Sequence, residues 1–338
     1  MKLKDWMNIW LNKYEKNALR LRTFCKYEQT IEKHINPALG EYNLNQLNAQ
    51  VLQDFVIDKV ENGNIRNGRK LAVSTVRNMI ALLKRALKRA VKLGYVDKEY
   101  TDLIILPRGT VKQVTAFEKD EQKLLEAYCL NHPKRNYMGI IICLYTGIRL
   151  GELLALEWSD IDFHKKLMHV NKTVYSIKPR NNDKRIMVVG KPKTKNSNRV
   201  IPLSRPLISI LRKLKGRRKT KYVLETTKRK VVDERSYQRT YKRILERIGV
   251  PYKNFHSLRH TFATRALEMG VDVKTVSELL GHRTTNITLS TYIHSMFTYK
   301  IDVMNRLGNA LLQDKHDQKA PEDFEDLVMR EEQQVANM

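Results

Sequence analysis

The segment "STVRNMIALLKRALKRAVKLG" is the strongest constraint that this sequence places on its fold. Apolar residues recur in it every three or four positions, and it ends at Gly94, as expected for an amphipathic helix with a glycine at its C-terminus. The apolar side consists of Val76, Ile80, Leu83, Leu87 and Val91. Such a face has to be covered by other helices, so we expect the first hundred residues to form a helical domain.

The opposite side of this helix carries closely spaced positive charges. They include Arg77, Lys84, Arg85, Lys88 and Arg89. The whole chain has 63 Lys and Arg against 36 Asp and Glu, a net charge of +27. This excess indicates a polyanionic partner, most often nucleic acid, so we interpret the five side chains as a DNA-contacting face. A face that only meets solvent is the alternative, and charge alone names no activity.

Changes of pattern divide the chain into two domains and a tail. Helical patterns fill residues 1–107, and the aperiodic stretch "LPRGTVKQVTAF" indicates a linker at 108–115. In residues 116–313, helices are interrupted near Gly147, then by the β-branched stretches "KLMHVNKTVY", "RIMVVGKPKT" and "RVIPLS". We expect "KTKNSNR" to form a hairpin turn between the last two. The fold class is therefore mainly α with a small antiparallel β-sheet.

Residues 314–338 differ from the rest in charge. They contain eight acidic and three basic residues, so this tail carries −5 while the preceding part carries +32. The composition predicts a loose acidic segment. Competition with DNA for the basic face is one role for such a tail, and a solvated chain end is the interpretation that we favour.

Several classes of protein are disfavoured by what the sequence lacks. The three cysteines, Cys25, Cys129 and Cys143, are odd in number and widely spaced, unlike a disulfide framework or a zinc site. No signal-peptide core follows the N-terminus, and no apolar run approaches the roughly 20 residues of a membrane helix. These features predict a cytoplasmic protein without a membrane segment. No phosphate-binding glycine loop or metal-ligand cluster is evident, so we expect no metal and no cofactor.

One arginine stands in apolar surroundings. Arg149 lies within "TGIRLGELLAL", just after a glycine, where an otherwise apolar helix restarts. Burying a guanidinium among so many apolar side chains is costly unless an anion accompanies it. A structural salt bridge to Glu152 or Glu157 is the simplest interpretation, and a bound anion is the functional one.

Two histidines and a second arginine are three further residues of interest. His256 and Arg259 are three residues apart in "HSLR", so they share one helix face. His282 follows Gly281 at a predicted helix end, where an interaction with the helix C-terminus is the simpler explanation.

Together and in this order, the motifs "TGIRLGELLAL", "HSLRHTFAT", "LLGH" and "TLSTYIH" closely resemble the tyrosine recombinases, also called phage integrases. The segment "KPKTKNSNRVIPL" fits the same family, and the resemblance runs from Trp6 to Leu312. It implies a helical core-binding domain at 1–107 and an α+β catalytic domain at 116–313. The motifs are more similar to integrases of bacterial phages or conjugative elements than to chromosome-dimer resolvases.

The resemblance assigns four residues to the scissile phosphate. Arg149 and Arg259 would clamp its non-bridging oxygens, because guanidinium forks match phosphate geometry and stay charged. His256 would assist proton transfer at the nucleophile or donate to the phosphate, and His282 would donate to a non-bridging oxygen. These donors would stabilise the charge that develops on a five-coordinate phosphorus.

The resemblance also assigns the nucleophile and the general acid. Tyr292 would attack the phosphate and form a 3′-phosphotyrosine, whereas Tyr299 lacks the family's spacing from "LGH". A lysine would protonate the leaving 5′ oxygen, since an alkoxide leaves poorly. Lys193 fits best because it directly precedes a threonine, and Lys195 remains the alternative.

The partners that the resemblance implies are double-stranded DNA and three further copies of the chain. Two duplexes and two strand exchanges call for a homotetramer. Residues 304–312 are apolar enough to dock into a neighbouring protomer. An accessory DNA-bending or directionality factor is compatible with this assembly. The resemblance has this sequence opening directly in the core-binding domain; either its element uses a simpler DNA site, or the arm-binding domain of many integrases is missing from this chain. A regulator that no longer cuts DNA and a type IB topoisomerase are the rival interpretations.

Overall fold

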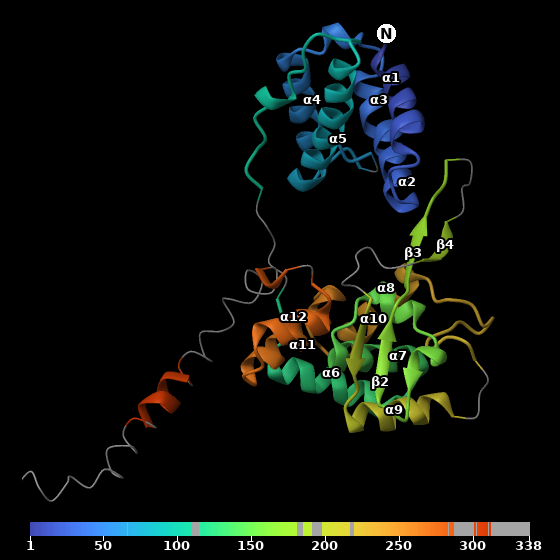
Figure 1. Cartoon of the computed structure of the whole chain (residues 1–338), viewed down its shortest axis with the longest axis vertical. Helices are drawn as coiled ribbons and strands as arrows, with labels where there is room; N and C mark the ends of the chain where they lie inside the picture. The colour runs from blue at the N-terminus through green and yellow to red at the C-terminus, as the bar shows by residue number, and fades with distance from the viewer. Residues whose placement is uncertain are drawn as a thin grey trace, which may run out of the picture. The chain divides into compact units, whose positions relative to one another are not determined.

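The computed structural model describes residues 1–65, 67–109, 115–180, 185–190, 198–216, 220–282, 284–286, 301, 303–309 and 311. The chain forms two compact units, the first from residues 1–113 and 174–190, the second from residues 114–173 and 191–338. Helices dominate the described residues, and the strands are few and short (Figure 1). This confirms the predicted fold class.

Helices make up most of the first unit. Its main elements are α1 (Leu3–Ile9), η1 (Trp10–Glu15), α2 (Leu21–Thr30), η2 (Ile31–Ile35), α3 (Asn36–Leu39), η3 (Leu44–Gln46), α4 (Ala49–Glu61), α5 (Val73–Lys92) and η4 (Thr101–Leu103). The segments η1 and η2 are π-helical continuations of α1 and α2. At the start of α4, the side chain of Asn48 accepts a hydrogen bond from the backbone N–H of Val51 and caps the helix.

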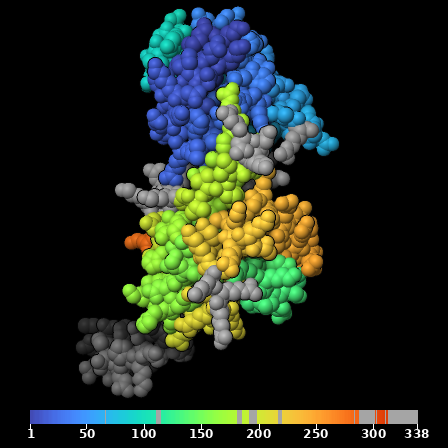
Figure 2. Space-filling model, turned by 90° about the vertical axis from the view of Figure 1, so that its right-hand side faces the viewer, coloured from blue at the N-terminus to red at the C-terminus, as the bar shows by residue number. Residues whose placement is uncertain are grey.

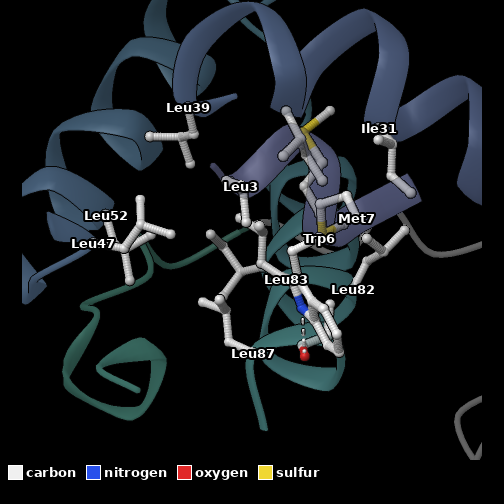
Figure 3. Close-up of a cluster of buried hydrophobic side chains, with 14 of the residues drawn as sticks. Leu3, Trp6, Met7, Ile31, Leu39, Leu47, Leu52, Leu82, Leu83 and Leu87 are labelled. Carbon is white, nitrogen blue, oxygen red and sulfur yellow. Dashed lines mark hydrogen bonds between the residues drawn. The ribbon is translucent and has the colours of Figure 1, made fainter. Parts of the chain in front are cut away.

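The core of the first unit is formed by side chains of α1, α4 and α5 together with those of η1, η2, α3 and η3 (Figure 3). As predicted for α5, Val76, Ile80, Leu83 and Leu87 are buried, while Val91 is half-buried. Trp6 of α1 is fully buried, and its indole N–H donates to the carbonyl oxygen of Ala86 at 3.0 Å. The apolar face of the basic helix is therefore covered by its own unit, which leaves the charged face outward.

Two strands from far along the sequence complete the first unit. Strand β3 (Thr173–Ile177) pairs with β4 (Ile186–Gly190). The amide of Gln29 in α2 donates to the carbonyl of Lys178 at 2.9 Å, and Arg180 forms an ion pair with Glu32 at 2.6 Å. In Figure 2, the yellow-green surface of these strands meets the blue helices. The predicted pairing of β4 with the next strand, β5 (Arg199–Pro202), is wrong, because β5 belongs to a different sheet. Residues 193–197 of the predicted hairpin turn lie outside the described residues.

The second unit is built around one apolar helix. Its helices are α6 (Lys119–Asn131), α7 (Arg135–Thr146), α8 (Leu150–Ala155), η5 (Trp158–Asp160), α9 (Arg205–Lys215), α10 (Glu234–Arg247), α11 (His256–Glu268) and α12 (Val273–Leu280). Helix α7 contacts α6, α8, α9, α10 and α11, and four successive residues, Ile140, Ile141, Ile142 and Cys143, are buried. A helix that is apolar on every side has to be surrounded in this way.

A small sheet lies beside these helices. Its strands are β1 (Ile161–Asp162), β2 (Leu167–Val170) and β5 (Arg199–Pro202), in the order β1-β2-β5. Both pairings are antiparallel, and Met168 of the central strand lies opposite Ile161 on one side and Ile201 on the other. All three side chains are buried, so the sheet covers part of the same core. No helix in the described part of the chain is long and apolar enough to cross a membrane.

Candidate active site

The break between α7 and α8 sets the position of Arg149. Helix α7 ends at Thr146 because Gly147 adopts a left-handed conformation with φ of 64°. This confirms the predicted interruption near that glycine. Arg149 then stands immediately before the first residue of α8 in extended conformation. Its side chain is 35% exposed, so the guanidinium is held at the edge of the unit, where a ligand can reach it.

The anionic partner of Arg149 is Glu152. The Arg149 guanidinium donates to one carboxylate oxygen at 2.8 Å, and its backbone N–H donates to the other at 3.0 Å. Glu157, the other predicted partner, pairs instead with Lys172 at 3.0 Å. Arg149 also donates to the carbonyl oxygen of Gly281 at 3.1 Å, which ties α8 to the end of α12.

Arg259 is the buried arginine of the site. It lies in the first turn of α11, three residues after His256, as the spacing predicted. Its two terminal nitrogens donate to the carbonyl oxygens of Gly147 at 2.8 Å and Leu280 at 2.7 Å. One guanidinium thus joins the α7–α8 turn to the end of α12.

His282 is placed by the end of α12. Gly281 takes a left-handed conformation after Leu280, and the backbone N–H of His282 donates back to the carbonyl of Ser277 at 3.0 Å. The backbone thus caps the helix and fixes the point at which His282 leaves it.

The side chains of Arg149, Arg259, His256 and His282 influence one another electrostatically. Burial, His260, Arg259 and Arg149 together lower the pKa of His256 from 6.5 to about 4. Burial and the two arginines, joined by His256 and His260, lower the pKa of His282 to about 3. Both imidazoles are therefore neutral at pH 7. The structure brings Arg149, Arg259, His256 and His282 into one positively charged site.

Two residues of this site were missed in the sequence. The His260 ring lies edge-on to His256, with centroids 4.9 Å apart, and burial and Arg259 lower its pKa to about 4. Its position four residues after His256 was an available signal. Arg199 on β5 forms an ion pair with Glu152 at 2.9 Å, although it looked like an ordinary strand residue. The predicted Lys193, Lys195 and Tyr292 lie outside the described residues.

Comparison with protein families decides the identity. Residues 115–298 match the phage integrase family, and residues 2–59 match the N-terminal SAM-like domain of phage integrases. The first match alone spans more than half of the chain. The chain belongs to the phage integrase family. It is a tyrosine recombinase, an enzyme that recombines DNA at specific sites.

Individual proteins are similar to this recombinase in sequence or in fold. A tyrosine recombinase XerC-like protein of Caldanaerobacter subterraneus is 31% identical over 334 residues, covering 92% of this chain and 83% of that protein. The integrase of transposon Tn1549, solved with circular intermediate DNA, matches with a TM-score of 0.74 at 19% identity, over 91% of this chain and 99% of the other. A lambda integrase tetramer on a Holliday junction matches with a TM-score of 0.63 at 17% identity, over 84% and 78%.

The predicted DNA-contacting face of the recombinase lies on α5 in the first unit. Several of its charges are balanced by nearby acidic groups: Arg85 pairs with Glu15 at 2.6 Å, and both Lys84 and Lys88 pair with Asp102. Arg85 and Lys88 nevertheless remain exposed, and Lys84 is half-buried. The pairs therefore order the side chains without removing them from solvent.

A groove runs along the same face. It has a volume of about 420 Å³ and is lined by Trp10, Tyr14, Glu15, Ala18, Arg85, Lys88, Arg89 and Lys92. The guanidinium of Arg89 lies 4.8 Å from the centre of the Tyr14 ring, which fixes its direction. Arg77 stands apart and donates to the carbonyl of Pro107 at 3.3 Å. The five predicted DNA contacts thus divide into a groove-lining group and flanking positions.

Proposed function

We propose that this recombinase integrates or excises a mobile element by cleaving and rejoining DNA through a 3′-phosphotyrosine at Tyr292. The observation that carries the proposal is the meeting of Arg149, Arg259, His256 and His282 around the end of α12. Tyr292 follows His282 by only ten residues in the sequence. A phosphodiester bound at this site therefore lies within the reach of a tyrosine on the next segment.

The two arginines and two histidines have separate tasks in this reaction. The partly exposed guanidinium of Arg149 binds a non-bridging oxygen, and Arg259 holds the site's backbone while adding positive charge. His256 is neutral at pH 7, so it can accept the phenolic proton as Tyr292 attacks phosphorus. His282 donates to a non-bridging oxygen, and the fixed charges stabilise the five-coordinate transition state.

The cleavage step needs neither a metal nor a nucleotide, because the bond formed, the bond broken and the proton transferred are all accounted for. The Tyr292 oxygen forms a bond to phosphorus, the bond from phosphorus to the 5′ oxygen breaks, and Lys193 supplies a proton to that oxygen. Lys195 is the alternative proton donor. A 5′ hydroxyl from the partner duplex then attacks the phosphotyrosine, so the ester bond energy is conserved through strand exchange.

The active assembly is a homotetramer on two DNA duplexes in the bacterial cytoplasm. The likeness to a lambda integrase tetramer on a Holliday junction supports this stoichiometry. Met304, Leu307 and Leu311 are exposed apolar residues near the described C-terminal end, which suits docking of residues 304–312 into a neighbouring protomer. The five basic residues of α5 track the DNA backbone, and an accessory bending or directionality factor completes the assembly.

A covalent-trapping experiment tests the proposed function. The binding site is first selected from random duplexes by the purified protein, and a nick beside the scissile phosphate then lets the 5′ fragment diffuse away. Wild type is expected to form a protein–DNA adduct that survives denaturation, and Tyr292→Phe is expected to form none. Tyr299→Phe is the matched control and should behave as wild type. Absence of the adduct from wild type on the selected site would point to a non-cleaving regulator.

A further inference from the structure

Three successive carbonyl groups at the end of α12 each bind a different arginine. Arg199 donates from Nε to the carbonyl of Leu279 at 2.7 Å. Arg259 donates to the carbonyl of residue 280 at 2.7 Å, and Arg149 donates to that of residue 281 at 3.1 Å. The last carbonyls of a helix lack partners within the helix and carry its negative end. Three guanidiniums therefore hold the backbone that directly precedes His282.

Arg199 differs from Arg149 in its exposure and in the element that carries it. Its side chain is only 7% exposed, against 35% for Arg149, and it projects from strand β5. Its terminal nitrogens donate to the two oxygens of Glu152 at 3.2 and 2.9 Å. Arg199 is thus held inside the unit, and one of its acceptors, Glu152, also binds Arg149.

Glu152 connects Arg199 to Arg149. Its carboxylate is 3% exposed and accepts from both guanidiniums. Burial alone would raise the pKa of Glu152, but Arg199, followed by Arg149, lowers it below its usual value. The carboxylate is therefore ionised, and each arginine satisfies part of its charge.

We propose that Arg199 is a positioning residue for DNA cleavage. By engaging Glu152, it leaves the Arg149 guanidinium bound to the carboxylate through one nitrogen and to the Gly281 carbonyl through another, with its exposed edge open to substrate. Without Arg199, the buried carboxylate has Arg149 as its remaining arginine in the described structure, and a bidentate pair between them is the favoured geometry. The Leu279 carbonyl also loses its donor, three residues before His282. This role rests on the proposed cleavage function.

The test measures the single-turnover rate of adduct formation at saturating DNA, with the dissociation constant and the melting temperature measured in parallel. Arg199→Met keeps much of the side-chain volume and removes the charge. Its rate is expected to fall about 100-fold, because displacement of catalytic groups by about 1 Å has effects of that size. The dissociation constant is expected to stay within about threefold, since Arg199 is held inside the unit.

Arg265→Met is the matched control. Arg265 also pairs with a carboxylate, Glu268, at 2.7 Å and donates to a backbone carbonyl, that of Phe117, at 2.7 Å. Its carboxylate is not shared with Arg149, so this variant should lower the melting temperature without changing the rate at temperatures where it is folded.

A second-site change separates positioning from support of the fold. Adding Glu152→Gln to Arg199→Met removes the charge that captures Arg149, so the rate is expected to recover about tenfold over Arg199→Met alone. A purely structural role predicts a further loss. If Arg199→Met does not fold, Arg199→Lys serves instead, and about a tenfold loss is expected because an ammonium cannot reproduce the guanidinium fork.

The outcomes distinguish the two proposals. A normal wild-type adduct with an unchanged rate in Arg199→Met, or in Arg199→Lys if that variant is used, overturns the positioning role alone. Failure of Glu152→Gln to restore any activity does so as well. A wild-type protein that forms no adduct overturns the cleavage function and the positioning role with it.

Discussion

The guanidinium of Arg259 donates a hydrogen bond to the carbonyl oxygen of Gly147 at 2.8 Å, across 112 residues of sequence. Gly147 ends α7 in a left-handed conformation, and Arg149 follows it by two residues. The contact therefore fixes the spacing between the turn that carries one arginine and the helix that carries the other. Changes to this turn should affect stability and chemistry together.

The first prediction concerns Gly147→Ala. A Cβ at this position would lie 2.5 Å from a ring carbon of Phe262 and 2.7 Å from a methyl carbon of Leu280, on a backbone with φ of +64°. Backbone strain and overpacking should together lower the free energy of unfolding by about 2–4 kcal/mol. Denaturant unfolding measures the loss, and adduct formation should slow as well.

Gly249→Ala is the control for that variant. Gly249 has a similar φ of +69°, but a Cβ there would have no atom within 4 Å. Only the strain contribution of about 1 kcal/mol is expected, with an unchanged rate of adduct formation. Equal losses in the two variants would contradict the clash with Phe262 and Leu280.

The second prediction is a loss of stability on mild acidification. The folded-state pKa values of His256 and His260 are about 4, and that of His282 is about 3, all below the ordinary 6.5. The unfolded chain therefore binds more protons than the folded one between these values, and stability falls as the pH drops below about 6.5. Unfolding free energies at pH 7.5 and 4.5 should show the decrease.

The variant His260→Gln checks whether the three histidines cause the loss of stability at low pH. It removes one of the three titrating groups, so the decrease between pH 7.5 and 4.5 should become shallower. A decrease as steep as that of wild type would assign the effect to other groups.

The third prediction identifies the proton donor to the leaving group. Lys193→Ala should slow cleavage by at least about 100-fold, the usual contribution of a positioned general acid. Replacing the bridging 5′ oxygen by sulfur should restore the rate, because a thiolate leaves without a proton. Lys195→Ala should change the cleavage rate less than Lys193→Ala and gain little from sulfur. The reverse pattern would assign the role to Lys195.

The fourth prediction tests the α5 face. Lys88 is exposed and lines the groove, so Lys88→Ala should weaken DNA binding equally for all sequences. The slope of log affinity against log salt should decrease in magnitude by about 0.9 for the lost phosphate contact. Lys4→Ala is the control, because Lys4 of α1 pairs with Glu41 and does not line that groove. An unchanged slope in Lys88→Ala would indicate a solvated face.

Local patterns in the sequence predicted the helices well and the strand partners poorly. The apolar face of α5 and the interruption at Gly147 follow from spacing and from one residue type, so both were confirmed. A β-branched stretch identifies a strand but not its partner, and the expected hairpin was wrong because β5 pairs with β2. Pairing depends on contacts made far along the chain.

The dependence on contacts far along the chain also explains which site residues could be predicted from the sequence. Arg149, Arg259, His256 and His282 belong to motifs whose order is informative by itself. Arg199 is recognisable only through its acceptors, Glu152 at a distance of 47 residues and Leu279 at 80 residues along the sequence. A lone arginine at the start of a strand gives no sign of either.

The hairpin of β3 and β4 also bears on how this enzyme can be dissected or recombined with others. Because residues 174–190 belong to the unit formed by residues 1–113, the chain passes between its two units three times. A fragment that starts at residue 114 carries the hairpin but lacks α2 and η2, whose residues Gln29 and Glu32 bind the segment between its strands. The units are not interchangeable cassettes joined by one linker, and a chimera that keeps both intact needs three junctions.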